Sequence, residues 1–310
     1  MARVVRGGVV ESVHHGLAVV TDAAGAVLFA VGDPGAAVLP RSANKPLQAV
    51  GSLRAGTPAR EELLAVAASS HSGEPFHLDA VLRLLAAGGL DEGALRNTPD
   101  FPVGDEARIA WIAAGRARSS LAQNCSGKHA AMVTAAAASG WEPATYLEAT
   151  HPLQRLLTET VEELAGERVA AVVTDGCGAP QHGLTLRALA RAFGGLAAAP
   201  DGEQRLVADA MRRHPEYVGG TGRDVTRLMR DVPGLVAKDG AEGVYAVGLP
   251  DGRGVAVKIA DGATRARGVL LAEVLRLAGI GTPEALAALA EELVLGHGRP
   301  VGRVEAVRLG

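Results

Sequence analysis

The sequence predicts a mixed α/β protein of the α+β kind, in which both chain ends build one antiparallel sheet and a mostly helical segment is inserted between them. Three observations predict this. Short apolar runs separated by turn residues fill the first 40 residues, similar runs return after residue 232, and apolar residues recur at helical spacing in between. We therefore expect a sheet lobe from 1–40 and 232–310, a helical lobe from 41–231, and an active site between the lobes.

The strands are predicted at the two ends of the chain. The early strands are expected at Val9–Val13, Ala18–Asp22 and Ala26–Val31. The last two are separated by Ala23, Ala24 and Gly25, which suit a hairpin turn. The late strands are expected at Leu235–Lys238, Val244–Leu249, Gly254–Ile259 and Arg303–Leu309.

The segment between these strands predicts a series of helices, because its apolar residues and its helix-forming composition follow the helical repeat. The expected helices are Ser42–Ala55, Arg60–Ala68, Pro75–Ala87, Asp105–Ala117, Gly127–Ala138, Pro152–Ala165, Leu186–Phe193 and Asp201–Arg213. Val169–Thr174 is interpreted as a strand within this part. Two further helices, Thr264–Leu277 and Pro283–Leu293, are expected among the late strands.

Charge and hydropathy exclude two classes of partner. The 310-residue chain has a formal net charge of −3, which gives no basic field for nucleic acid, and no apolar run reaches the length of a membrane span. The N-terminus lacks the charged-then-apolar layout of a signal peptide, so we expect a cytoplasmic protein with reduced cysteines.

The first candidate site is the Ser-x-x-Lys pattern of Ser42 and Lys45. On a helix this spacing places both side chains on one face. A serine becomes a good nucleophile when a neighbouring base takes its proton, and a lysine is a base only as the free amine. Arg41 beside them is a cation, which favours the uncharged amine. The sequence therefore predicts a nucleophile and its base here.

Lysine is rare in this chain, and its rarity strengthens that interpretation. Of 31 Lys and Arg residues only four are lysines, at positions 45, 128, 238 and 258. Arginine cannot give up its proton in a protein, whereas lysine can act as a base or as a metal ligand. A lysine retained in a chain that otherwise uses arginine is a good functional candidate.

Three polar stretches hold further candidates. His71 lies in a loop with several serines, and Cys125 and Cys177 each lie in a Gly-containing stretch next to a predicted helix or strand. From spacing alone two interpretations stay open: Cys125, Lys128 and Cys177 converge on one metal ion, or the cysteines are small buried side chains.

Lys238 precedes a predicted strand in the order Lys238-Asp239-Gly240. A Ser-x-x-Lys on the first helix and a Lys-x-Gly beside a late strand form the layout of penicillin-recognising serine enzymes. The match is partial, because there is no Ser-Asp-Asn and Asp239 stands where those enzymes have Thr or Ser. A penicillin-recognising serine hydrolase is therefore an alternative function.

Six blocks taken together resemble one family. In chain order they are RSANKP, SSHSGEP, NCSGKH, TDGCGAP, RRHPEYVGGTGR and AVKIADG. They are similar to the asparaginase II family, the rhizobial-type L-asparaginases, and they span nearly the whole chain. The resemblance implies hydrolysis of L-asparagine to L-aspartate and ammonia, a fold similar to serine β-lactamases and glutaminases, and a homodimer.

The resemblance also implies roles for single residues. Ser42 and Lys45 are similar to the family's nucleophile and base, and Ser70 and Lys238 to a second Ser–Lys pair. The implied zinc ligands are Cys125, Lys128 and Cys177. The implied substrate-binding residues are Arg41, His71 and Asp175, with Asp175 beside the metal. A non-catalytic zinc-binding protein remains a further alternative.

Overall fold

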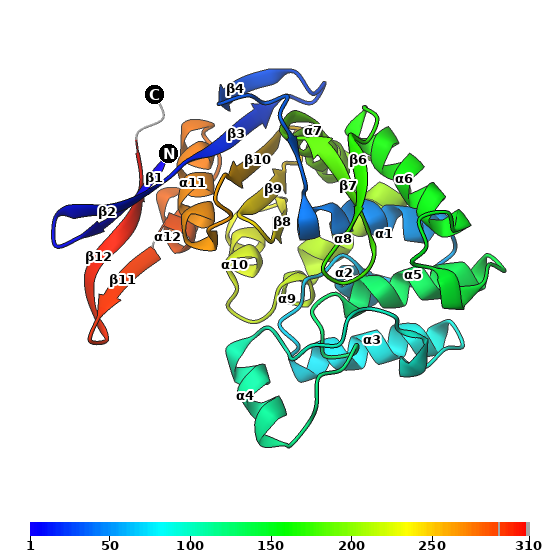
Figure 1. The fold of residues 1–310 in the computed structure, drawn as a ribbon. Helices are drawn as coiled ribbons and strands as arrows, with labels where there is room; N and C mark the ends of the chain where they lie inside the picture. The colour runs from blue at the N-terminus through cyan, green and yellow to red at the C-terminus, as the bar shows by residue number, and fades with distance from the viewer. Residues whose placement is uncertain (291, 308–310) are drawn as a thin grey trace. The chain divides into compact units, whose positions relative to one another are not determined.

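The structure is a computed structural model, which describes residues 1–290 and 292–307. It is a mixed α/β protein with antiparallel sheets, so the predicted fold class is confirmed (Figure 1). Contacts divide the chain into two compact units. Unit 1 comprises Met1–Ala43, Leu184–Ala198 and the chain from Arg227 onward, and unit 2 comprises Asn44–Gly183 and Ala199–Thr226.

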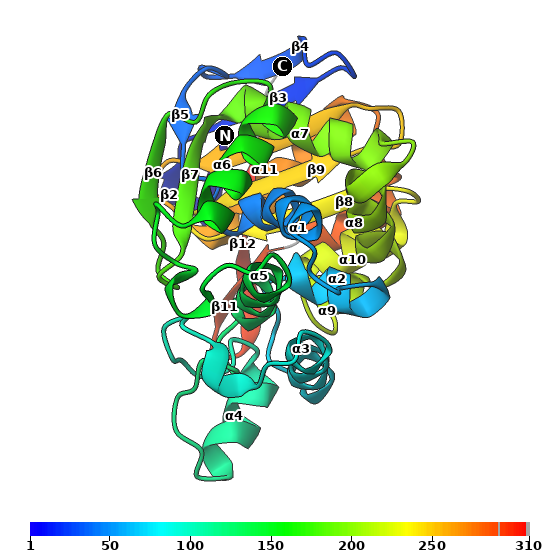
Figure 2. The same cartoon turned by 90° about the vertical axis from the view of Figure 1, so that its right-hand side faces the viewer.

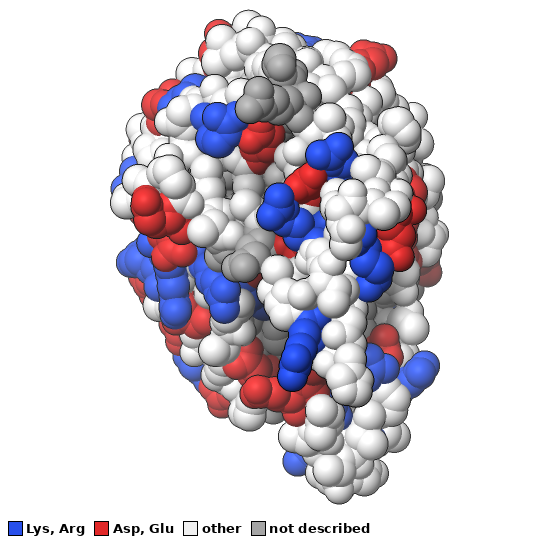
Figure 3. Space-filling model, turned by 90° about the vertical axis from the view of Figure 1, so that its left-hand side faces the viewer, with Lys and Arg blue, Asp and Glu red and all other residues white. Residues whose placement is uncertain are grey.

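The two chain ends meet in the first sheet of unit 1. Its strand order is β11 (Glu292–Gly296), β12 (Arg299–Ala306), β1 (Ala2–Arg6) and β2 (Val9–His14), all antiparallel. The blue and red strands of Figure 1 lie side by side for this reason. Arg3 and Arg303 both pair with Glu305 on this sheet, and positive and negative side chains are intermixed on the face drawn in Figure 3.

The second sheet of unit 1 has five antiparallel strands. In order they are β4 (Val27–Val31), β3 (Gly16–Thr21), β10 (Gly254–Ile259), β9 (Val244–Gly248) and β8 (Val236–Gly240). β8 is an edge strand, and its register with β9 places Lys238 opposite Ala246 and Asp239 opposite Tyr245. Successive residues of a strand point to opposite faces, so Lys238 and Asp239 leave the sheet on different sides.

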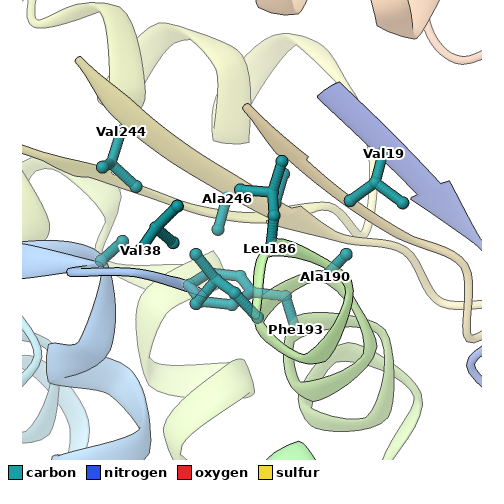
Figure 4. Packing of buried hydrophobic residues seen from close by; sticks show 10 residues of the cluster. Val19, Val38, Leu186, Ala190, Phe193, Val244 and Ala246 are labelled. Atoms are coloured by element: carbon teal, nitrogen blue, oxygen red, sulfur yellow. The ribbon is translucent and has the colours of Figure 1, made fainter. Parts of the chain in front are cut away.

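Helices cover both faces of the five-stranded sheet. On one face, α7 (Leu186–Ala198) packs Leu186 and Phe193 against Val244 and Ala246 (Figure 4). Ala43 belongs to the same buried cluster. On the other face, α11 (Thr264–Leu277) contacts β9 and β10, and α12 (Pro283–Ala290) packs on α11.

Unit 2 is mostly helical. Its helices are α1 (Lys45–Arg54), α2 (Glu61–Ala67), α3 (Pro75–Ala87), α4 (Asp105–Ala113), α5 (Ser126–Ala138), α6 (Pro152–Ala165), α8 (Gly202–Arg213) and α9 (Pro215–Val218). Figure 2 shows α5 between α1 and α3, and every α5 residue from Ser126 to Ala136 is buried. β6 (Ala171–Thr174) and β7 (Pro180–Thr185) form an antiparallel hairpin, and the last two residues of β7 pair with β5 (Ala37–Val38). The helix α10 (Asp224–Asp231) contains the point in the chain at which unit 2 ends and unit 1 resumes.

Several predicted elements differ from the structure. The ends of the chain form two sheets rather than one, and the sequence interpretation missed β1, β5, β7 and β11. The helix predicted at Pro283–Leu293 ends at Ala290, and Leu293 lies in β11, because Glu292–Gly296 pairs with β12. The predicted last strand lies at Arg299–Ala306, and positions 308 and 309 fall outside the described residues.

No helix within residues 1–290 and 292–307 is long and apolar enough to cross a membrane.

Candidate active site

A buried lysine organises the polar centre of unit 2. Lys45 is 1% exposed, and its Nζ donates to Ser69 O at 2.7 Å, to Ser70 Oγ at 3.0 Å and to Cys125 Sγ at 3.1 Å. Lysine is almost never fully buried without partners, because removing an ammonium from water is costly. The three contacts use the three N–H groups of an ammonium and bring a hydroxyl and a thiol to one amine.

Three segment ends supply these contacts. Lys45 begins α1, where the following Pro46 is tolerated because the first helical N–H groups need no partner. Ser69 and Ser70 follow the end of α2, and Cys125 directly precedes α5. The sequence placed Lys45 in a predicted helix and Ser70 and Cys125 in polar stretches beside helices, and packing brings them together.

A second amine lies next to both cysteines. Lys128, on the first turn of α5, donates from Nζ to Cys177 Sγ at 3.1 Å. A hydrogen bond with Cys177, together with the nearby Lys45 and Lys128, lowers the pKa of Cys125 well below its usual value despite burial. The same hydrogen bond, together with burial, raises the pKa of Cys177. The pKa values of the two thiols are therefore shifted in opposite directions.

The two cysteines and Asp175 also act on the pKa of Lys128. Burial by itself would lower the pKa of Lys128, but Cys177, Cys125 and Asp175 outweigh burial and raise it. Asp175 Oδ2 lies 3.5 Å from Cys177 Sγ, so a carboxylate stands next to the thiols.

The side chains present fit zinc. Zinc prefers thiolate sulfur and uncharged nitrogen, and two thiols and an amine lie here in contact inside the protein. Within the described part of the chain, no three His, Cys, Asp or Glu side chains cluster as metal ligands. A metal at this place would therefore need Lys128 as a ligand.

His71 ties two of these segments together. It is fully buried, its Nε2 lies 2.8 Å from Ser126 Oγ, and its backbone N–H donates to Asn124 O at 3.2 Å. Burial, with His77 and Lys45 nearby, lowers the pKa of His71 well below its usual value. His71 is thus an uncharged side chain that links the Ser70 loop to the start of α5.

Unit 1 holds the other predicted residues. Ser42 lies in a 3-10 turn, Arg41–Asn44, and not in the α-helix, which begins at Lys45. The helix predicted at Ser42–Ala55 therefore begins three residues later, at Lys45. Arg41, directly before Ser42, has φ +52°, a left-handed conformation that costs a non-glycine residue about 1–3 kcal/mol and is found mainly at functional sites.

The turn that carries Ser42 lies against the end of β8. A Cβ on Gly240 would be 2.5 Å from Pro40 O and 3.3 Å from Ala43 N, so only glycine allows this approach. Two residues earlier on the same face, Lys238 is fully buried, and its Nζ donates to Asp239 Oδ1 at 2.6 Å. Within unit 1, the turn that carries Ser42 therefore lies against the Lys238-Asp239-Gly240 segment.

Reasoning from the sequence missed one relay. Thr158 Oγ1 donates to Gln154 O at 2.9 Å, so it must accept from His182 Nε2, also at 2.9 Å. His182 Nδ1 is then the acceptor for Asn44 Nδ2, at 3.0 Å. These hydrogen bonds hold Asn44, the residue before Lys45, in place. In the sequence, the only sign of them was a polar residue directly before that lysine.

A sequence profile described as L-asparaginase II matches residues 2–306. The chain belongs to the L-asparaginase II family. The resemblance inferred from the six sequence blocks is therefore confirmed, and membership of the L-asparaginase II family marks the chain as a hydrolase.

Solved structures give weaker similarities. A β-lactamase from Mycobacterium bovis is 18% identical, with 80% of this chain and 88% of that chain covered and a TM-score of 0.45. Mglu in its native form is 17% identical, with 83% of this chain but 59% of Mglu covered and a TM-score of 0.46. EstCE1, a hydrolase with promiscuous acyltransferase activity, is 12% identical, with 89% and 93% covered and a TM-score of 0.43. The comparison with curated proteins returns no match.

Proposed function

We propose that this member of the L-asparaginase II family is an amidohydrolase that converts L-asparagine to L-aspartate and ammonia. The observation that carries the proposal is Lys45, a buried amine 3.0 Å from the hydroxyl of Ser70 and three residues after Ser42. A hydroxyl beside an amine that can take up its proton is the arrangement that nucleophilic hydrolysis requires.

The reaction would proceed as acyl transfer. Ser42 Oγ attacks the side-chain amide carbon of asparagine, and Lys45, once its ammonium has released one proton to solvent, takes the serine proton. The C–N bond then breaks, and the same proton goes to the leaving nitrogen, which departs as ammonia. Water attacks the resulting ester, releases aspartate and returns the proton to Ser42.

Ser70 would pass protons in this scheme. Its Oγ accepts from Lys45 Nζ at 3.0 Å, and Lys45 also donates to Ser69 O and Cys125 Sγ. The lysine is therefore held at a defined position by two groups besides the Ser70 hydroxyl. Such fixed positioning is what makes general base catalysis effective.

Negative charge that develops on the amide oxygen needs fixed donors. The N–H of Ala43 is occupied, because it donates to Pro40 O at 3.0 Å. We therefore assign the donor role to the backbone N–H of Ser42, whose position is set by the left-handed conformation of Arg41. Arg41, His71 and Asp175 remain the proposed substrate-binding residues, although the burial of His71 suits an indirect role.

Zinc is part of the proposal. Cys125, Lys128 and Cys177 would hold the ion, and their donor set and burial fit it. When bound, zinc would supply a Lewis acid that polarises or orients the substrate amide. The homodimer implied by the resemblance is proposed as well, and light scattering of the purified protein would test it.

A panel of amides scored by ammonia release tests the proposed activity. We expect release from L-asparagine, and the same panel with L-glutamine and D-asparagine measures selectivity. Covalent labelling by a fluorescent penicillin without ammonia release would instead favour the penicillin-recognising alternative. Zinc binding with neither activity would leave a non-catalytic zinc protein.

A further inference from the structure

Two of the three groups that hold the amine of Lys45 come from one short loop. Ser69 O accepts from Lys45 Nζ at 2.7 Å and Ser70 Oγ accepts at 3.0 Å, and both residues lie in the loop 69–74 between α2 and α3. A loop has no regular hydrogen-bond ladder of its own, so its position depends on the groups that bind it from outside. Whatever holds the loop 69–74 therefore also sets the surroundings of the Lys45 amine.

The segment 218–221, at the end of α9, binds this loop, and both belong to unit 2. Three contacts at alternate loop residues join them: Ser70 N–H donates to Val218 O at 3.0 Å, Ser72 Oγ donates to Gly219 O at 3.0 Å, and Glu74 accepts from Thr221. The loop that contacts Lys45 is thus attached to the segment 218–221 along its length.

The contact between Glu74 and Thr221 has two hydrogen bonds. Glu74 Oε1 accepts from the backbone N–H of Thr221 at 2.8 Å, and Glu74 Oε2 accepts from its hydroxyl at 2.7 Å. Hydrogen bonds to a carboxylate are shorter and stronger than those between neutral groups, and a two-point contact also fixes the direction of approach. Since Glu74 directly precedes α3, this contact fixes the end of the loop.

The close approach of the two segments depends on Gly220. Its φ is +140°, a conformation that other residues rarely adopt, and a Cβ there would collide with Ser72 Oγ and lie 2.8 Å from Glu74 Oε1. Gly220 O in turn accepts from Thr226 Oγ1 at 2.7 Å, which holds this peptide in place. Two of the three contacts between the segments therefore need a glycine at this position.

We propose that Glu74 and Thr221 are positioning residues, whose contact keeps the loop 69–74 where Ser69 O and Ser70 Oγ fix the amine of Lys45. The inference rests on the proposed function for the role of Lys45 as the base. Neither Glu74 nor Thr221 has to touch the substrate. A misplacement of about 1 Å far from the reacting atoms can cost about a hundredfold in rate, so a contact at the end of the loop can affect turnover.

Steady-state kinetics with L-asparagine test this role, and thermal unfolding of each variant is the control for folding. Glu74→Ala should lower kcat about tenfold or more and change KM less than about threefold, because the contact acts on the base and not on substrate binding. Glu159→Ala, at an exposed position on α6 in the same unit, is the matched control and should leave both constants unchanged.

Variants of Thr221 separate the hydrogen bond from the shape of the side chain. Thr221→Val keeps the shape but loses the hydroxyl, so it should lower kcat about threefold or more. Thr221→Ser keeps the hydroxyl and should retain the wild-type kcat within about twofold. A Thr221→Ser protein as slow as Thr221→Val would overturn the role of this hydrogen bond.

A double variant links the contact to the hydroxyl beside Lys45. In a Ser70→Ala background, Glu74→Ala should lower kcat less than about threefold, because the hydroxyl that the loop positions is already gone. Equal losses from Glu74→Ala in the wild-type and Ser70→Ala backgrounds would show a general structural role and overturn the inference. Normal kcat in Glu74→Ala, or a raised KM at unchanged kcat, would overturn it as well.

Amide hydrogen exchange of the loop is a readout that needs no turnover. The N–H of Ser70 should exchange at least about tenfold faster in Glu74→Ala than in Glu159→Ala, because the loop opens more often. Unchanged exchange would overturn the inference in active and inactive protein alike. Wild-type protein that releases ammonia from no amide would instead remove the proposed function, so the two failures are distinguishable.

Discussion

The amine of Lys45 lies 3.1 Å from Cys125 Sγ while it also donates to Ser70 Oγ at 3.0 Å. A single buried cation therefore contacts both the hydroxyl group of the proposed proton path and the thiol of the proposed metal site. Changes at either cysteine are therefore expected to reach Lys45.

Ser42→Ala should abolish ammonia release while the fold is kept, because Ser42 is a half-buried residue of a 3-10 turn and the change removes only its hydroxyl group. Ser70→Ala should slow turnover without removing it, since Lys45 keeps its contacts with Ser69 O and Cys125 Sγ. Mass spectrometry of protein trapped with an electrophilic asparagine analogue should locate the adduct on Ser42. An adduct on Ser70, or normal activity of folded Ser42→Ala, would contradict the assignment.

Lys45→Arg should be nearly as damaging as Lys45→Met, because arginine keeps the charge but cannot accept a proton. Lys258→Arg is the matched control, since Lys258 is partly exposed and contacts the backbone carbonyls of Glu242 and Ile259. Steady-state kinetics of the three proteins compare them directly. A Lys45→Arg protein that turns over normally would mean that Lys45 acts through its charge alone.

The purified protein should carry about one zinc per chain near neutral pH, as the ligand count implies. Cys125→Ser and Cys177→Ser should retain less. Zinc should be lost as the pH falls, because each of the three ligands binds zinc only after it has lost a proton. In Lys128→Met the zinc content should depend less steeply on pH, because one of these ligands is missing. Elemental analysis of protein prepared without chelators measures this. Full asparaginase activity in metal-free protein would remove zinc from the proposal.

Gly240→Ala should reduce activity strongly, because the new Cβ would press on Pro40 O and displace the turn that carries Ser42. Gly195→Ala is the control: on α7, a Cβ there meets no atom within 4 Å, so the change should be neutral or stabilise by about 0.5–1 kcal/mol. Kinetics and thermal unfolding of both variants give the comparison. Equal activity of the two proteins would show that the turn tolerates displacement.

His182 should make the protein acid-sensitive. Burial, with Lys128 nearby, lowers its pKa to about 4. The imidazole of His182 becomes protonated near pH 6.5 in the unfolded chain but only near pH 4 in the folded chain. Its contribution to the free energy of unfolding is therefore complete above pH 6.5, and about 3 kcal/mol is lost as the pH falls toward 4. Urea unfolding at pH 7 and pH 5 should show a smaller acid loss in His182→Gln than in wild type or in the exposed-site control His15→Gln. The same acid loss in all three would refute this role.

The sequence alone determined the fold class and which residues to examine. Strand and helix patterns depend on neighbours in the chain, so the late strands and most helices could be predicted from local periodicity. Lysine scarcity was equally informative: Lys45, Lys128 and Lys238 are all buried in polar clusters, whereas Lys258 is not. The choice between arginine and lysine is a chemical signal that needs no coordinates.

Only the tertiary structure decided which groups meet. Lys45 contacts Cys125, which is 80 residues away, because distant segments pack together. The side chain of Lys238 contacts the neighbouring Asp239, although successive residues of a strand point to opposite faces. Local sequence predicts neither contact. The pairing of β1 with β12 likewise joins residues from opposite ends of the chain, and neither strand has a local pattern that names its partner. Hydrogen bonds and ion pairs form wherever burial brings donors and acceptors within about 3 Å, and that proximity is a property of the folded chain and not of any short stretch of its sequence.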